Sequence, residues 1–589
     1  MSPNAGPRER LELLWWAIAA AGVVLGLRLA QLQILDAAEY RLAAERNSSQ
    51  MIYQTAPRGR IYDRAGREIA SNQAAFSLIF LPGKDRARHD LEPLARELGR
   101  QLRRDPKDLL EALEKAEREQ SVVRLAENLP KATMFQLSEL KTLYPGIELI
   151  TEARRYYPYG RFASHLLGFM GKMNMRDWRE RKSKGYRADS RIGKMGLEGS
   201  FEDELRGSDG GIQMEVDAQG RLKRKLGQID YKAGSNIHLT IDADVQKAAD
   251  EGLRLSVTGE GAAVAIDPRN GEILAMSSQP DFDPNALLST DPEEVKRNAQ
   301  DLPEFNKAIA GAYPPGSIFK PIVGLAGLSE GRITRDDSFF CPGFLDRGGR
   351  TFLCWEHKGH RRMSWLMGLA QSCDVYFYNV GLKTGGALIE RYARGFGLGA
   401  KTNVALRGEK SGHLFGPETR RKAGKSWYEG DTLNLAIGQG ELTVTPMQMA
   451  VVAAAFANRG AVWRPHYTRK IVYADGRPDY VQKSELISTV PAKDAAWDSV
   501  QEAMQVVVSS GTGYPARVPG LIVAGKTGTA QNPHGEDHAW FIAYAGRPGE
   551  PASIAISVLV ANGGHGGVTA APVARKMILA RFGMGAIRL

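Results

Sequence analysis

The stretch of residues 261–278, GAAVAIDPRNGEILAMSS, decides the fold class of this chain. Two runs of small and apolar residues, 261–267 and 272–278, flank the turn sequence Pro-Arg-Asn-Gly. Asn-Gly between two apolar runs is typical of a β-hairpin, because both residues tolerate the backbone angles of a tight turn. The stretch therefore predicts two antiparallel strands.

Segments far away in the sequence repeat this pattern. Residues 236–241 alternate like a strand, and the helical stretch that follows has Asp242 or Asp244 as its N-cap and ends near Leu255. Two more strands and a closing helix are predicted at residues 539–545, 553–561 and 573–582. Strands at both ends with a helical middle predict an α+β domain, residues 235–589, whose sheet unites distant parts of the chain.

The chain before residue 235 has a different character. Residues 36–234 are rich in charge and short elements, with amphipathic helices expected over 91–120 and a turn between extended segments over 58–66. No catalytic constellation stands out there. The simplest interpretation is a spacer or docking domain.

One membrane span is predicted at residues 13–35, after a short tail of residues 1–12. Residues 13–27 contain no charge, and the apolar bias continues beyond Arg28, whose long side chain can reach out of the bilayer. A retained anchor is favoured over a cleavable signal peptide, which the small residues of this segment also fit. Basic residues lie on both sides, so charge alone does not decide the orientation.

Composition excludes several classes of protein. The chain has 589 residues, 43% of them hydrophobic and 25% charged, which is unlike disordered, collagen-like or polytopic membrane proteins. Its formal charge of +11 fits nucleic acid, an anionic membrane surface or an acidic polymer as partner. Three cysteines are too few for a disulfide scaffold.

The first catalytic motif is Tyr-Pro-Pro-Gly-Ser-Ile-Phe-Lys at residues 313–320. The Pro-Pro-Gly breaker places Ser317 at a helix start, and Lys320 follows almost one turn later on the same face. An amine with a lowered pKa at this position can accept the serine proton, and the helix N-terminus favours an oxyanion. Ser-x-x-Lys alone occurs by chance about once in a chain of this length.

Two further motifs follow in order. Ser372-Cys373-Asp374 offers a second hydroxyl for proton relay, or simply a helix start capped by the serine or the aspartate. Residues 526–529, Lys-Thr-Gly-Thr, close an apolar strand. A cation and two hydroxyls there can hold a substrate carboxylate, and Gly528 lets the ligand backbone approach the strand edge. The alternative is a simple turn after a strand.

With these three motifs in this order, the chain resembles the penicillin-binding proteins. More narrowly it resembles class B enzymes of the elongation, or rod-shape, type. The resemblance covers nearly the whole chain and includes the anchor, Arg-Gly-x-Ile-x-Asp-Arg at 58–64, Gly-Gln-Gly at 438–440 and His-Ala-Trp-Phe at 538–541. It implies a serine β-lactamase-like transpeptidase domain with a central antiparallel sheet, preceded by an elongated pedestal over 36–234.

The resemblance implies a peptidoglycan D,D-transpeptidase that acts during cell elongation. Ser317 would attack the D-Ala-D-Ala bond of a stem peptide, Lys320 would be the base, and Ser372 and Lys526 would complete the proton relay, with Asp374 in the second motif. Thr527, Gly528 and Thr529 would bind the substrate, with the backbone N–H groups of Ser317 and Thr529 as the oxyanion hole. β-Lactams would acylate the same serine.

The resemblance also implies partners and location. The partners would be peptidoglycan stem peptides and a RodA-type SEDS glycosyltransferase in the membrane, and no nucleic acid. The protein would cross the cytoplasmic membrane once, with its N-terminus inside and its bulk outside. The chemistry would require no cofactor.

The three cysteines lie between Ser317 and Asp374 and, with His360, form the spacing Cys341-x12-Cys354-x5-His360-x12-Cys373. Three sulfurs and an imidazole suit tetrahedral zinc, although the spacing matches no compact finger. A Cys341–Cys354 disulfide or separate packed thiols are the alternatives. Some elongation-type relatives carry a metal beside the active site at matching positions, which favours a structural zinc ion here; His357 is a spare imidazole.

Other functions are weighed against this one. A β-lactamase or antibiotic sensor shares the serine chemistry, but a secreted lactamase needs neither anchor nor pedestal. A bifunctional enzyme with its own glycan polymerase is disfavoured because the pedestal shows no catalytic cluster. An interaction protein, in which span and pedestal mainly activate the polymerase, is the contrasting class.

Overall fold

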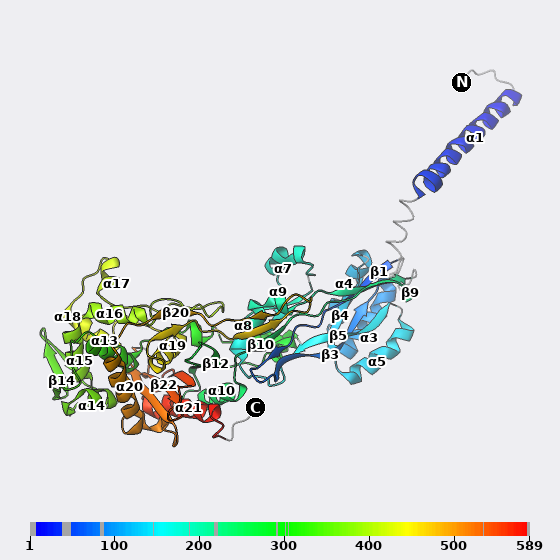
Figure 1. Cartoon of the computed structure of the whole chain (residues 1–589). Coiled ribbons are helices and arrows are strands. Elements are labelled where there is room, and N and C mark those ends of the chain that lie inside the picture. The colour runs from blue at the N-terminus through cyan, green and yellow to red at the C-terminus, as the bar shows by residue number, and fades with distance from the viewer. Residues whose placement is uncertain are drawn as a thin grey trace. The chain divides into compact units, whose positions relative to one another are not determined.

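The computed structural model describes residues 7–37, 49–82, 88–119, 121–144, 146–187, 189–216, 222–289, 292–300, 302–303, 305–533 and 535–585. The chain, drawn in Figure 1, forms two compact units. Each unit is assembled from three segments that are not consecutive in the sequence. Unit 1 comprises residues 1–56, 74–154 and 208–232, and unit 2 comprises 57–73, 155–207 and 233–589.

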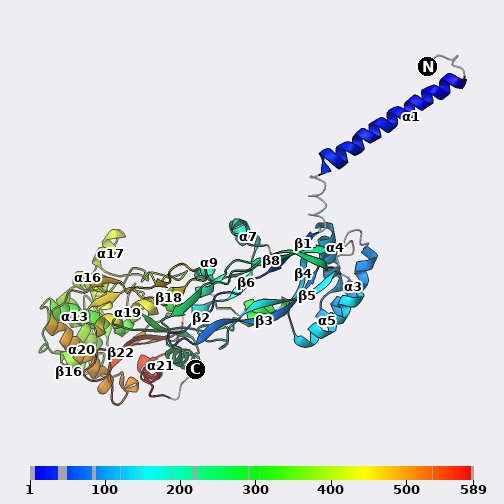
Figure 2. The ribbon, with the colours of Figure 1, turned by 45° about the vertical axis from the view of Figure 1, so that its right-hand side comes forward.

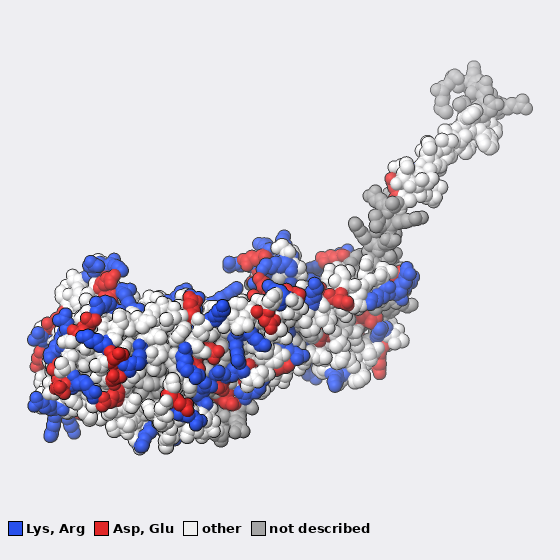
Figure 3. Space-filling model, in the orientation of Figure 1, with Lys and Arg blue, Asp and Glu red and all other residues white. Residues whose placement is uncertain are grey.

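Unit 1 begins with the apolar helix α1 (Pro7–Ala30), which continues as a π-helical turn over Gln31–Leu35. Among the described residues, Leu14–Leu35 is the one segment long and apolar enough to cross a membrane. It is largely white in Figure 3, which marks the scarcity of charged side chains along it. The predicted span therefore coincides with one continuous helical segment.

Among the described residues, the rest of unit 1 consists of two small sheets and three helices. One sheet has the order β1-β8-β9, and the other pairs the second half of β3 with β4 and β5. The elements are β1 (Ser49–Gln54), β3 (Glu68–Phe80), α3 (Arg88–Leu102), α4 (Pro106–Glu119), β4 (Val123–Leu129), α5 (Lys131–Leu143), β5 (Ile147–Tyr156), β8 (Gly210–Val216) and β9 (Leu222–Ile229). Leucines of α3, α4 and α5 pack against β3 and β4 in one apolar core, so the amphipathic helices predicted over 91–120 are confirmed.

Unit 2 is built around a five-stranded antiparallel sheet of order β12-β11-β23-β22-β21. Its strands are β11 (Gly261–Ile266), β12 (Ile273–Gln279), β21 (Ile522–Ala530), β22 (His538–Gly546) and β23 (Ile554–Val560). The predicted hairpin at 261–278 and its union with the last strands of the chain are confirmed. The Lys-Thr-Gly-Thr motif occupies the end of edge strand β21.

Both faces of this sheet are buried, by different helices. Ala263 and Ala265 of β11 face a core shared with α10 (Ala243–Arg254) and α21 (Gly566–Arg581). Ala262 and Val264 face the opposite core, which includes α19 (Pro446–Ala457). Alternate residues of a strand point to opposite faces. A strand buried on both sides is apolar throughout, which is why 261–266 shows no polar alternation.

The closing helix α21 begins at Gly566, seven residues before the predicted start at 573, so that boundary is wrong. Gly566, Gly567 and Pro572 are poor helix formers, and their composition suggests a loop. In the structure a Cβ at Gly566 would lie 2.1 Å from the carbonyl oxygen of Trp540 and 2.4 Å from that of Gly528. Packing of the helix start directly on β21 and β22 thus outweighs local propensity.

The remaining elements of unit 2 are drawn in Figures 1 and 2. Its helices are α6 (Ser164–Leu167), α7 (Met175–Arg181), α8 (Gly196–Ser200), α9 (Glu202–Leu205), α11 (Pro292–Gln300), α12 (Lys307–Ala310), α13 (Lys320–Ser329), α14 (Trp365–Ala370), α15 (Asp374–Thr384), α16 (Gly386–Gly395), α17 (Pro417–Lys422), α18 (Glu429–Ala436) and α20 (Asp494–Ser509). Short 3-10 turns lie at η2 (Lys182–Lys184), η3 (Ala286–Leu288), η4 (Gly316–Phe319) and η5 (Tyr514–Ala516). Two-stranded ribbons pair β6 (Met170–Lys172) with β7 (Arg191–Gly193), β13 (Phe339–Cys341) with β16 (Arg361–Met363), β14 (Phe344–Arg347) with β15 (Arg350–Leu353), and β17 (Ala461–Trp463) with β20 (Leu486–Thr489).

A second sheet in unit 2 has the order β19-β18-β10-β2 and continues into the first half of β3. Its strands are β2 (Ile61–Tyr62), β10 (Asn236–Leu239), β18 (Thr468–Val472) and β19 (Tyr480–Val481). The Asp242 side chain caps α10 by accepting a hydrogen bond from the Val245 backbone N–H. Of the two predicted N-caps, Asp242 is therefore the correct one. Of the range 58–66 predicted as a turn, residues 61–62 form β2, and the turn itself follows at residues 64–65, before β3.

Buried ion pairs hold the segments 57–73 and 155–207 together within unit 2. The guanidinium groups of Arg58 and Arg155 both bind Glu198, at 2.5 and 2.6 Å, and Arg58 also binds Glu202 at 2.8 Å. Burial of Glu198 works against its charge, but the two arginines keep its pKa below the ordinary value. We call this set the arginine–glutamate cluster. The cluster gives a structural role to Arg58, the first arginine of the Arg-Gly-x-Ile-x-Asp-Arg segment.

Candidate active site

Ser317 lies in the 3-10 turn η4, directly before α13, so the predicted helix start is confirmed. Gly316 has φ +56° and donates its N–H to the carbonyl of Gly438 at 2.9 Å, which fixes this turn against the Gly-Gln-Gly loop. The Ser317 side chain is half-buried, and its hydroxyl makes no hydrogen bond to any residue that the structure describes. The position leaves the hydroxyl available to a substrate.

Lys320 is completely buried and turns toward the second motif. Its Nζ donates to Asp374 Oδ1 at 2.7 Å and to the Ser372 carbonyl at 2.8 Å, and lies 3.3 Å from Ser372 Oγ. The first two motifs, more than fifty residues apart in sequence, therefore meet through one ammonium group.

The second motif connects two helices. Helix α14 ends at Ala370, Ser372 adopts φ +55°, and α15 begins at Asp374. Cys373 is the N-cap, because its sulfur accepts from the Tyr376 N–H, so neither the serine nor the aspartate has the capping role considered from sequence. A left-handed backbone at a non-glycine residue is strained, and such strain often accompanies functional positions. Here it turns the Ser372 hydroxyl toward both lysines.

Lys526 approaches Ser372 from β21. Its Nζ donates to Ser372 Oγ at 2.8 Å and to the Thr527 carbonyl at 2.9 Å, and the side chain is completely buried. Burial, together with the positive charge of Lys320, holds the pKa of Lys526 well below its ordinary value, although Asp374 partly opposes this. Two amines and one carboxylate thus lie in one buried site. The site has no net charge when one amine is an ammonium and the other is neutral.

Both oxygens of Asp374 accept hydrogen bonds. Oδ1 binds Lys320, and Oδ2 accepts the backbone N–H of Trp355 at 2.9 Å. An asparagine would present its NH₂ group to one of these two donors. The geometry therefore accounts for aspartate in the second motif, and it identifies Trp355 as a contact residue that the sequence reasoning missed.

A second residue that the sequence did not indicate lies beside the Lys-Thr-Gly-Thr strand. Thr527 Oγ1 lies 2.6 Å from Thr512 Oγ1, and the Thr512 hydroxyl also approaches the Ala370 carbonyl at 3.4 Å. A Cβ at Gly528 would lie 2.9 Å from Ile318 Cγ2, so this glycine lets β21 pack against the Ser317 turn. Thr512 lies between two glycines in a loop without any motif, and only tertiary folding brings it beside Thr527.

The four predicted metal ligands converge next to the second motif. One donor atom from each of Cys341, Cys354, His360 and Cys373 lies within 4.8 Å of the others. His360 Nδ1 is 3.7 and 3.5 Å from the sulfurs of Cys341 and Cys354. All three cysteines are free thiols, so the Cys341–Cys354 disulfide alternative is not formed. Three sulfurs and one imidazole at these separations suit a tetrahedral ion such as zinc; the spare His357 does not belong to this set.

Comparison with known proteins agrees with this geometry. The family model "Penicillin binding protein transpeptidase domain" matches residues 261–579, and "Penicillin-binding Protein dimerisation domain" matches 53–239. "Peptidoglycan D,D-transpeptidase MrdA" of Acinetobacter baumannii is 33% identical over 93% of this chain and 84% of its own length.

Two solved structures are also similar over most of the chain. One, described as "Structural coordination of polymerization and crosslinking by a peptidoglycan synthase complex", has a TM-score of 0.72 and 30% identity, and the match covers 98% of this chain and 100% of that one. The other is Penicillin-Binding Protein (PBP2) in complex with MreC from Helicobacter pylori, with a TM-score of 0.75 and 26% identity over 91% of this chain and 99% of that one.

Proposed function

This chain belongs to the penicillin-binding protein transpeptidase family, and on that premise we propose that it cross-links peptidoglycan stem peptides through an acyl-enzyme on Ser317. The observation that carries the proposal is the position of Ser372 Oγ, 2.8 Å from Lys526 Nζ and 3.3 Å from Lys320 Nζ. Three distant segments meet there, beside a half-buried serine at a helix start.

Acylation proceeds by attack of Ser317 Oγ on the carbonyl carbon of the penultimate D-Ala. The C–N bond to the terminal D-Ala breaks, and that residue leaves as a free amine after it gains a proton. An amine of a neighbouring stem peptide then attacks the ester, which forms the cross-link and returns the proton to Ser317. A β-lactam stops after the first step, because its ring-opened amine stays attached to the acyl group.

The lysine pair supplies the base for both steps. In the resting state one amine is protonated and paired with Asp374, and the other is neutral because burial and its charged neighbour disfavour a second ammonium. Lys320, near Ser317, takes the serine proton after its own proton has passed through Ser372 to the neutral Lys526, and Lys526 then protonates the leaving amine.

The substrate is held by the end of β21. The hydroxyls of Thr527 and Thr529 bind the terminal carboxylate, and the backbone N–H groups of Ser317 and Thr529 stabilise the oxyanion. Thr512 orients the Thr527 hydroxyl by accepting or donating at 2.6 Å.

Intact-protein mass spectrometry with penicillin tests the acyl-enzyme. Wild type should gain one penicillin mass, S317A should gain none, and the exposed control S510A should behave as wild type. Labelling of S317A would contradict the assignment of Ser317, and rapid turnover of penicillin without a lasting adduct would indicate a β-lactamase instead.

We further propose that the chain works with a membrane-bound partner. Residues 13–35 form the anchor, 36–234 a pedestal and 235–589 the transpeptidase domain, and the anchor and pedestal bind and activate a RodA-type SEDS glycosyltransferase. In support, one similar solved structure is a peptidoglycan synthase complex that coordinates polymerization and crosslinking, and another is a complex with MreC. S317A should keep polymerase activation in a reconstituted assay, whereas exchange of the anchor for an unrelated span should abolish it.

The catalytic part lies outside the cytoplasmic membrane, with the N-terminus inside, because the proposed substrate is the cell wall. A single cysteine introduced at exposed Lys483 in a chain with Cys341, Cys354 and Cys373 changed to serine should react in intact cells or spheroplasts with a membrane-impermeant maleimide. Protection until the membrane is lysed would reverse the orientation.

A structural zinc ion held by Cys341, Cys354, His360 and Cys373 is proposed to fix the segment that carries Trp355 and the second motif. The chemistry needs no such ion, and no step passes through it. Metal analysis should find one ion per wild-type chain and none in C354S, whose melting temperature should no longer respond to a chelator. A wild-type chain purified without metal and insensitive to chelator would leave packed thiols as the correct alternative.

A further inference from the structure

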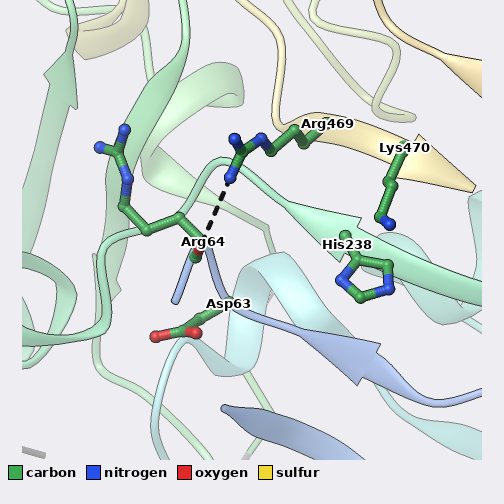
Figure 4. Close-up of a pocket in the computed structure, with 5 residues that line it drawn as sticks. All are labelled: Asp63, Arg64, His238, Arg469 and Lys470. Carbon is green, nitrogen blue, oxygen red and sulfur yellow. Dashed lines mark hydrogen bonds between the residues drawn. The ribbon is translucent and has the colours of Figure 1, made fainter. Parts of the chain in front are cut away.

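A small cavity of about 290 Å³ lies in unit 2 on a sheet that carries none of the three catalytic motifs (Figure 4). The residues that line it come from β10, β18 and the turn after β2, and they are Asp63, Arg64, His238, Arg469 and Lys470. Four of the five are basic. The cavity is therefore separate in composition and origin from the transpeptidase site.

A β-bulge creates the basic side of this cavity. In the antiparallel pair of β10 and β18, His238 lies opposite Lys470 and Leu239 lies opposite Thr468, so Arg469 is an extra residue. Consecutive side chains of a regular strand point to opposite faces, whereas a bulge redirects one of them. Both Arg469 and Lys470 consequently line the same cavity.

The acidic residue in the cavity does not neutralise these two cations. Asp63 Oδ1 accepts the backbone N–H groups of Ala65 and Arg67, and Oδ2 binds the Arg67 side chain at 2.7 Å. Arg64 is paired with Glu272, and in Figure 4 its side chain points away from His238 and Lys470. The carboxylate of Asp63 is thus already occupied.

Arg469 and Lys470 form no ion pair with any described residue of the chain. The Arg469 guanidinium donates a hydrogen bond to the Arg64 carbonyl at 3.4 Å, drawn as the dashed line in Figure 4. The opposite strand adds His238, whose ring stacks on Tyr62 with centroids 4.7 Å apart. Burial, and then the charges of Lys470 and Arg469, lower the pKa of His238, although the charge of Asp479 partly opposes this. Among the residues that line the cavity, basic side chains outnumber the one carboxylate.

We propose that this cavity binds a phosphate group, either as inorganic phosphate or as part of a phospholipid headgroup. A guanidinium, an ammonium and an imidazole N–H provide donors from two adjacent strands, and the one carboxylate among the lining residues, Asp63, is already hydrogen-bonded elsewhere. Two unpaired cations suit an anion that carries more than one charge on tetrahedrally arranged oxygens better than a planar, singly charged carboxylate. The proposal does not depend on the transpeptidase activity.

Calorimetric titration of the full chain in detergent with inorganic phosphate at low ionic strength tests the first source. Wild type should bind one phosphate saturably, and R469Q and K470Q should each weaken binding at least about tenfold, since each removes one charged hydrogen-bond donor. K483Q is the matched control, because Lys483 is an exposed lysine of the same region outside the cavity. It should bind phosphate as wild type does.

Native mass spectrometry of the full chain from nanodiscs that contain phosphatidylglycerol tests the second source. Retention of one lipid by wild type and K483Q, but not by R469Q or K470Q, would support the headgroup even if free phosphate fails to bind. Equal binding of both probes by wild type and all variants, or binding by none, would overturn the proposal. Unchanged penicillin acylation and melting temperature in each variant establish that the fold is intact.

Discussion

Two buried charge clusters in unit 2 are built from similar parts and differ in their balance. In the arginine–glutamate cluster, Arg58 and Arg155 face Glu198 and Glu202, so two positive charges meet two negative charges. At the catalytic motifs, two amines are accompanied by one carboxylate: Asp374 pairs with Lys320 directly and acts on Lys526 through its charge. A balanced buried cluster keeps its protons fixed and holds segments together, whereas the unbalanced one must keep an amine neutral, which makes it a base.

The largest effect is expected when one of the two amines in the unbalanced cluster is removed. K526M should lower the second-order rate constant of acylation by penicillin by a factor of about 10²–10⁴, because it removes a group that moves the serine proton. Its melting temperature should not fall, because burial of an amine that is charged in the unfolded chain and loses its proton on folding costs free energy. Stopped-flow or gel-based acylation kinetics and thermal unfolding measure the two quantities, and an unchanged acylation rate would contradict the proton relay.

Breaking the balanced cluster should have the opposite pattern. E198Q leaves two buried guanidinium groups without their shared carboxylate, and about 3–5 kcal/mol of unfolding free energy should be lost. The fraction that remains folded should be acylated at the wild-type rate. Denaturant unfolding combined with acylation kinetics checks this, and a stable E198Q chain with impaired acylation would place the cluster in the catalytic machinery.

Asp374 sharpens the comparison because it is the single anion of the catalytic set. D374N should cost about 1.5–3 kcal/mol in acylation, from the loss of a buried charged hydrogen bond. The carboxylate raises the pKa of Lys526, so its removal should extend the neutral form of this amine to lower pH and move the acidic limb of the rate profile downward. A limb that stays in place or moves upward would show that Asp374 does not set the charge of the lysines.

Thr512 should give the smallest effect. T512V removes the hydroxyl beside Thr527 and should weaken the acylation efficiency by about 1 kcal/mol, mainly through poorer substrate binding. T512S should restore wild-type behaviour. If T512S is as impaired as T512V, the methyl packing of Thr512 matters and its hydroxyl does not.

Much of the fold was predictable from local pattern. The hairpin at 261–278, the helix after Ser317 and the strand that ends in Lys-Thr-Gly-Thr were all correctly predicted, because apolar runs, Asn-Gly turns and proline breakers act over a few residues. The start of α21 was not, since Gly566 and Gly567 become helical only when they pack on β21 and β22.

The sequence by itself determined which chemical groups are present: a serine and lysine one turn apart, a second serine before an aspartate, and a lysine at the end of a strand. Tertiary structure decided their relations, namely that Ser372 lies between the two lysines, that Trp355 and Lys320 occupy both oxygens of Asp374, and that Thr512 joins Thr527. The reason is physical: proton sharing and pKa depend on distance and burial, and contacts between residues far apart in the chain leave no periodic pattern in the sequence.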